Sequence, residues 1–99
     1  MLVHNVFFSL KGELDRDQVS HFRTGLESLK KIEHAEAVYI GTPADVAERP
    51  VLDNQYDFCL TVLLKDVAAH DAYQADPIHQ AFISTFREFW EKVRVCDAD

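Results

Sequence analysis

Two side chains in the last third of the chain, Tyr73 and His79, are the residues best suited to carry out chemistry. They flank Asp76 and Pro77, which are favoured at the N-cap and at the first position of a helix, so the sequence predicts a helix that begins at Pro77. His79 then lies in the first turn, where the helix dipole disfavours the imidazolium, and we expect a neutral ring. A neutral imidazole can accept a proton and a phenol can donate a hydrogen bond, which together suit acid–base chemistry on a small molecule.

The segments around these residues must position them, and their apolar patterns predict an α+β domain. Residues 2–10 are apolar on both faces, as in a strand that is covered on two sides. The predicted order βαββαβ, with the second helix in two pieces, is typical of a ferredoxin-like fold with a four-stranded antiparallel sheet and helices on one face. The expected strands are residues 2–10, 35–41, 55–65 and 92–97. Three helices are expected, each after an aspartate: one after Asp15, one after Asp66 to about residue 75, and one after Asp76 to about residue 90. Asp15 forms a predicted capping box with Gln18.

Length and charge restrict the classes of function. The 99 residues form one domain, and a net charge of −7 with no basic run longer than Lys30-Lys31 argues against nucleic acid or an anionic membrane as a partner. No stretch approaches the roughly 20 apolar residues of a membrane span, and no signal peptide is recognisable. Cys59 and Cys96 lie in expected strands without CxxC spacing, so we expect reduced thiols in a cytoplasmic protein. A disulfide stays open if those two strands are neighbours.

We expect no metal and no cofactor. Asp66, His70 and Asp71 have a spacing that could place them on one helix face, but a short acidic helix produces such a spacing by chance. No HExxH, paired-cysteine, EF-hand or glycine-rich phosphate-binding pattern is present. His21, His34 and His70 are expected to be exposed and without a role. The polar segment 44–54 is expected to be a loop, and a lid, an interface arm or a passive surface loop are all open.

Several stretches together resemble one known family, the stress-responsive dimeric α/β-barrel (Dabb) domain. They are residues 1–8 (MLVHNVFF), 39–41 (YIG), 56–58 (YDF), 73–82 (YQADPIHQAF) and 89–93 (FWEKV). The resemblance spans essentially the whole chain and implies a homodimer whose two sheets meet face to face as a barrel. One face of the first strand would then meet the helices, and the other face, which carries Val3, Asn5 and Phe7, would meet the partner.

The resemblance also implies candidate functional residues. Cyclases similar to this family close linear polyketides by aldol chemistry, in which a base removes a proton from a carbon next to a carbonyl and a donor stabilises the enolate. By position, His79 would be the base, Tyr73 would orient it or donate to the substrate oxygen, and His4 would line the pocket. Such cyclases carry a further histidine on the third strand. This chain has Phe58 there, which removes a hydrogen-bonding group and narrows the pocket.

Three functions therefore stay open. We expect foremost the binding of a small, partly apolar molecule between the sheet and the helices, near His4, Phe58, Tyr73 and His79. The alternatives are an enzyme of the cyclase type with His79 as general base, and a non-catalytic dimer that acts by interaction. Structural roles also stay open: His79 could hydrogen-bond Tyr73 or a carbonyl and tie the two helical pieces together, His4 could be a core histidine with its hydrogen bonds made, and Tyr73 could be a packing residue.

Overall fold

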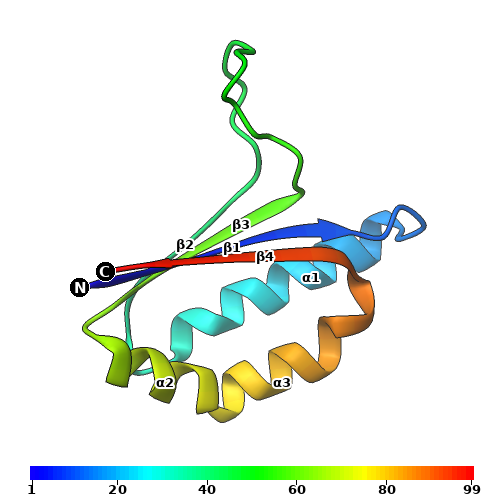
Figure 1. Cartoon of the computed structure of the whole chain (residues 1–99). Coiled ribbons are helices and arrows are strands. Elements are labelled where there is room, and N and C mark those ends of the chain that lie inside the picture. The colour runs from blue at the N-terminus through cyan, green and yellow to red at the C-terminus, as the bar shows by residue number, and fades with distance from the viewer.

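The computed structural model describes residues 1–99 and shows a four-stranded antiparallel sheet with every helix on one face (Figure 1). The strands are ordered β2-β3-β1-β4, which confirms the predicted ferredoxin-like fold. None of the helices has the length and apolar character needed to span a bilayer. The elements are β1 (Leu2–Leu10), α1 (Arg16–Ser28), β2 (Ala35–Gly41), β3 (Phe58–Leu64), α2 (Val67–Ala75), α3 (Pro77–Phe86) and β4 (Trp90–Ala98), with 3₁₀ turns at Leu29–Lys31 and Arg87–Phe89.

Strand β1 lies inside the sheet between β3 and β4, and its side chains alternate between the two faces. His4, Val6 and Phe8 point toward the helices and are buried, whereas the intervening side chains point to the open face and are half-buried. The register places His4 opposite Val62 on β3 and opposite Asp97 on β4. Residues directly opposite each other lie on the same face of a sheet, so Asp97 also points toward the helices.

Aspartates set the helix boundaries as the sequence predicts. The Asp15 carboxylate accepts a hydrogen bond from the Gln18 N–H, and the Gln18 side chain accepts one from the Asp15 N–H, which completes the predicted capping box. Asp76 is extended, ends α2 and caps α3 through the Ile78 N–H at 2.8 Å, with Pro77 as the first helical residue. Asp76 therefore separates Tyr73 on α2 from His79 on α3.

Aromatic rings fill most of the space between the sheet and helices α1 and α3. Phe22 on α1 packs against four other phenylalanine rings with centroid separations of 5.1–5.8 Å. Gly25 is required where α1 approaches α3, because a Cβ at this position would overlap the ring of Phe86. Phe22 and the four rings around it are called the aromatic cluster, which consists of Phe8, Phe22, Phe58, Phe82 and Phe86.

Two predicted boundaries are wrong. Strand β3 begins at Phe58 rather than at residue 55, and Tyr56 packs on Phe7 of the open face at 5.2 Å instead of sharing the face of Phe58. Asp57 bonds to β1 through both its backbone and its side chain: its N–H donates to the Phe8 carbonyl oxygen, and its carboxylate accepts from the Leu10 N–H. Helix α3 ends before residue 90, because a 3₁₀ turn leads directly into β4 and makes Trp90 its first residue.

The segment between β2 and β3 projects away from the sheet on the side opposite the helices (Figure 1). It contains no helix or strand, as the sequence predicts for residues 44–54. Cys59 on β3 and Cys96 on β4 point to this same open face, opposite Phe7 and Asn5 of β1. Because β1 separates their strands, the two thiols are free and no disulfide joins them. A reducing, cytoplasmic location stays a prediction.

Candidate functional site

A cavity of about 130 Å³ lies between the sheet and the two C-terminal helices. Nine of its twelve lining residues are hydrophobic. Val93 and Val95 on the edge strand β4 line it and remain exposed, so the cavity opens toward solvent along this edge. Its size is close to that of a cavity of about 150 Å³ that accommodates benzene, so it suits one small ring.

His79 supplies the main polar group of this cavity. The ring is buried, at 9% exposure, and its Nδ1 atom has no hydrogen-bond partner. Burial lowers the pKa of His79 below its ordinary value, and the nearby His4 and His70 lower it further, whereas the Gln74 backbone and Asp76 act in the opposite direction. The predicted neutral ring therefore agrees with this direction, although burial rather than the helix terminus is the main cause.

Tyr73 lies against both histidines but forms no hydrogen bond with either. Its side chain is fully buried, its ring centroid is 5.0 Å from that of His79 and 5.8 Å from that of His4, and its hydroxyl has no partner. Burial raises the pKa of the Tyr73 phenol well above its usual value, so the hydroxyl remains a donor. His79 and Tyr73 are not tied by a hydrogen bond. The other predicted partner, a backbone carbonyl, is represented by Gln74 at the end of α2, whose backbone interaction with the ring raises the pKa of His79.

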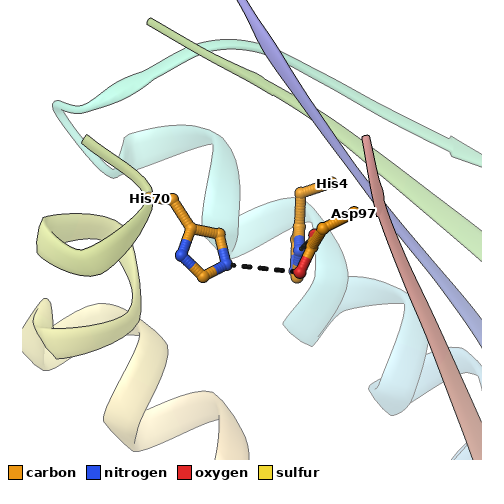
Figure 2. A group of neighbouring side chains, drawn as sticks. All are labelled: His4, His70 and Asp97. Carbon is orange, nitrogen blue, oxygen red and sulfur yellow. Dashed lines mark hydrogen bonds and ion pairs between the residues drawn. The ribbon is translucent and has the colours of Figure 1, made fainter. Parts of the chain in front are cut away.

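His4 lines the cavity and also belongs to a polar group at its end. The His4 Nδ1 atom is 2.5 Å from a carboxylate oxygen of Asp97, so this deeply buried histidine has the partner expected of a core histidine. His70 was predicted to be exposed, and this is wrong. Its side chain is only 21% exposed, and its Nε2 atom is 3.6 Å from the other oxygen of Asp97 (Figure 2).

Phe58 is not brought together with the other predicted site residues. It pairs with Phe8 near the far end of β1, whereas His4 pairs with Val62. Its ring is buried in the aromatic cluster, 5.5 Å from that of Phe22, and the Arg23 guanidinium lies 5.8 Å above it. Leu60 is the residue of β3 that lines the cavity with Trp90 and His79. The position predicted for the missing cyclase histidine is therefore a packing position in this structure.

Trp90 is a cavity residue that the sequence reasoning did not identify. Its indole Nε1–H is buried without a hydrogen-bond partner, and the ring lines the same cavity as His79. The sequence predicted that the last helix extends to about residue 90, which would place Trp90 at a helix end and not on the sheet. The predicted strand 92–97 begins two residues too late, since β4 begins at Trp90. A prediction that started this strand at Trp90 would have placed the indole on the sheet. Two buried and unpaired nitrogens, one from Trp90 and one from His79, thus border one small apolar space.

Comparisons with solved structures show the same fold in several proteins of low sequence identity. A dimeric ferredoxin-like protein of unknown function from Thermobifida fusca superposes with a TM-score of 0.79 at 20% identity, over 98% of this chain and 88% of its own. A Dabb family protein from Mesorhizobium loti has a TM-score of 0.79 at 23% identity, over 99% and 94%. The hydroxynitrile lyase from Passiflora edulis has a TM-score of 0.80 at 20% identity, over 98% and 90%.

No curated protein matches the chain significantly in sequence. A family model does match, and it extends from residue 2 to residue 99. This range contains the whole sheet, all helices and every residue of the cavity. The match and the fold agree with the resemblance seen in the sequence: the chain belongs to the stress responsive A/B barrel domain (Dabb) family.

Proposed function

We propose that the protein binds a small, partly apolar molecule that carries a carbonyl or hydroxyl oxygen in the cavity between β1, β4 and α3. The observation that carries this proposal is the pair of buried, unpaired nitrogens, His79 Nδ1 and Trp90 Nε1, on the wall of an otherwise apolar space. A buried polar atom without a partner costs about 1–3 kcal/mol, and natural domains have few of them. A ligand oxygen would accept from the indole N–H, and a ligand hydroxyl would donate to a neutral imidazole.

The apolar walls determine which molecules fit. Val6, Ile83 and Val93 offer methyl groups and no charge, so a ligand gains mainly by removing its hydrocarbon part from water. At about 25 cal/mol per Å² of apolar surface, a ring of six carbons gains several kcal/mol on entry. Charged ligands are disfavoured because they would lose their hydration without an ion pair. The expected class is therefore a neutral cyclic or branched ketone, alcohol or phenol.

Cyclohexanone tests this proposal, and methylcyclohexane is the matched probe without oxygen. We expect cyclohexanone to saturate shifts of the Trp90 indole and His79 ring signals in NMR spectra, with weaker binding of methylcyclohexane. The variant Ile83→Phe fills the cavity and should abolish these shifts. Ser84→Phe places the same side chain on the adjacent, exposed position of α3 and should leave them unchanged. Shifts that persist in Ile83→Phe would disprove binding in this cavity.

A second candidate function is an enzyme in which His79 removes a proton from a carbon next to a carbonyl. It is supported by the His79 imidazole on the cavity wall, whose pKa is lowered, and by the protonated Tyr73 phenol, whose ring contacts that imidazole from outside the cavity wall. A hydroxynitrile lyase has the same fold, which is an analogy of fold only. Exchange of the α-protons of cyclohexanone in D₂O measures this step directly. Exchange should exceed the buffer rate and disappear in His79→Gln. If cyclohexanone binds saturably but its α-protons do not exchange, the enzyme proposal is disproved and the binding proposal is retained.

We also propose that the functional unit is a homodimer formed through the open face of the sheet. No helix covers this face, which carries half-buried Val3, Phe7 and Leu63 (Figure 1). Its polar side chains are partly paired, since the Thr61 hydroxyl donates to the Asn5 carbonyl oxygen at 2.9 Å. The segment between β2 and β3 projects on the same side and would contact a partner. A relative of the same fold is described as dimeric.

Light scattering coupled to gel filtration tests the dimer. The wild-type chain should have twice the mass of one chain, and Val3→Asp should shift it to the monomer. Val3 lies opposite Leu63 and Ala98, so a carboxylate there would be buried in the dimer without a partner. Glu36→Ala changes an exposed position at the start of β2 and is the control. A monomeric wild-type protein would disprove the dimer, as would a Val3→Asp variant that keeps the dimer mass.

A further inference from the structure

Three side chains from three different elements meet at the end of the sheet that carries both chain termini. His4 comes from β1, Asp97 from β4 and His70 from α2, and all three point into the space between α2 and the sheet (Figure 2). One ligand atom from each lies within 4.8 Å of the others. Two imidazoles and a carboxylate are a donor set that Zn²⁺ and related ions use in proteins.

The two ring nitrogens of His70 each face a carboxylate. Its Nδ1 atom lies 3.2 Å from the Asp71 carboxylate, while its Nε2 atom faces Asp97 at 3.6 Å. If Nδ1–H donates to Asp71, Nε2 presents a lone pair toward an anionic oxygen, which is unfavourable. A metal ion between Nε2 and Asp97 removes this repulsion. A histidine that binds metal through one nitrogen commonly donates the other N–H to a carboxylate.

We propose that His4, His70 and Asp97 bind one divalent transition-metal ion of the Zn²⁺ type. Bonds of about 2.0–2.2 Å in a tetrahedral site place donor atoms roughly 3.4 Å apart. The separation of 3.6 Å between His70 and Asp97 already fits this value. The 2.5 Å separation between His4 and Asp97 is a hydrogen bond and must lengthen. Asp97 can rotate because its side chain is 38% exposed, and His4 releases its Nδ1 proton to solvent when that nitrogen binds metal.

The surroundings favour a cation and allow it to enter. A surface hollow beside the cluster contains three carboxylates, from Asp71, Asp97 and Asp99, and no lysine or arginine. Its remaining walls include Leu2, Val67 and His70. The whole chain carries a net charge of −7, which attracts cations from solution. Because three side chains leave at least one coordination position free, the ion would keep a water molecule on the side of this hollow.

This site is separate from the proposed cavity ligand, although His4 borders both. The metal donors face Asp97 and the hollow near the termini, whereas the cavity walls continue toward Trp90. Binding of cyclohexanone and binding of metal are therefore measured in separate experiments. A negative result for one proposal does not disprove the other.

Titration calorimetry with ZnCl₂ tests the site on tag-free protein that has been dialysed against EDTA and then against buffer. We expect one Zn²⁺ per chain. Loss of an outer carboxylate partner typically weakens metal binding about 10–100-fold, so Asp71→Asn should fall in this range. His70→Ala and Asp97→Asn remove a direct donor and should lose more than Asp71→Asn. His34→Ala removes an exposed histidine outside the cluster and should bind like the wild type.

NMR spectra of the histidine ring nitrogens locate the ion. Zn²⁺ should shift the nitrogens of His4 and His70 and leave those of His21 and His34 in place. Circular dichroism verifies that each variant is folded, and His70 and Asp97 are chosen because both are more exposed than His4. Binding that survives in His70→Ala would overturn the proposal. So would a wild type that binds no Zn²⁺.

Discussion

The layer between the sheet and the helices has two ends that each contain a fully buried aromatic side chain and differ in chemistry. At one end the aromatic cluster surrounds Phe22, which is fully buried and packs against four other phenylalanine rings. At the other end Tyr73 is also fully buried, yet its hydroxyl has no hydrogen-bond partner. The extent of burial does not distinguish Phe22 from Tyr73. The two ends differ because only the second contains buried polar atoms without hydrogen-bond partners.

This difference separates the part of the fold that supplies stability from the part available for function. Packed rings contribute through their buried area and through favourable edge-to-face contacts. Unpaired polar atoms in His79, Tyr73 and Trp90 reduce stability, and they gather near one cavity instead of being scattered over the core. Proteins violate local rules of stability mainly at functional sites, so the cavity end is where function is expected.

The largest effect on this comparison is expected from truncation at the aromatic end. Phe22→Ala removes a ring that touches four others and should lower the free energy of unfolding by about 3–5 kcal/mol. Urea denaturation at fixed protein concentration measures this change, because a dimer unfolds in a concentration-dependent way. A loss below about 1 kcal/mol would show that this end does not dominate stability. Phe22→Leu provides a milder variant if the alanine variant does not fold.

A smaller loss is expected from Gly25→Ala. The new methyl group would overlap the Phe86 ring, and such overpacking typically costs about 1–3 kcal/mol. The effect should appear although alanine is the better helix former by about 1 kcal/mol. Gly12→Ala is the matched control, since a Cβ at Gly12 meets nothing within 4 Å. If the two variants unfold at the same urea concentration, the close contact between α1 and α3 is not a constraint.

At the cavity end, a substitution at an equally buried aromatic residue should not lower the free energy of unfolding. Tyr73→Phe removes a buried hydroxyl that has no partner, so the free energy of unfolding should stay equal or rise by about 1 kcal/mol. The same urea experiment measures it. A loss greater than about 1 kcal/mol would mean that the hydroxyl has a partner in solution, and the contrast between the two ends would weaken.

The smallest expected effect is a pH dependence that also belongs to the cavity end. The pKa of His79 is lowered in the folded chain by burial and then by His4 and His70, while the unfolded chain keeps an ordinary value of about 6.5. The unfolded chain therefore binds more protons below about pH 6.5, and the free energy of unfolding should fall as the pH falls through that value. Above it, this contribution is constant. His79→Gln should reduce the slope; an unchanged slope would exclude His79 as its source.

The sequence predicted the local features of the fold well. Strand 2–10, strand 35–41 and the three aspartate caps agree with the structure, because each depends on residues close in sequence. The boundaries near Tyr56 and Trp90 failed, because Tyr56 packs on Phe7 of the open face and a 3₁₀ turn precedes β4, and the apolar pattern shows neither. Both failures involve the ends of strands, where pairing with a distant segment decides the start.

The candidate site was predicted only in part. His4, Tyr73 and His79 come together as expected, and the resemblance to the family supplied this grouping. Phe58 does not join them, because the register of β3 against β1 places it among the aromatic rings. His70 was assigned no role, because helical periodicity alone does not reveal that α2 packs over β1 and β4 at this position. Periodicity describes one element and not its neighbours.

The sequence by itself determined where helices begin, which faces are apolar and that His79 lies in a first helical turn. Caps and periodicity act over a few residues, so they can be read without the fold. Only the tertiary structure decided that His4 meets Asp97 across 93 residues of chain, and that His70 approaches both from a separate helix. Strand register and helix packing follow from the burial of the whole core at once. They decide which polar groups find partners and which remain unpaired beside the cavity.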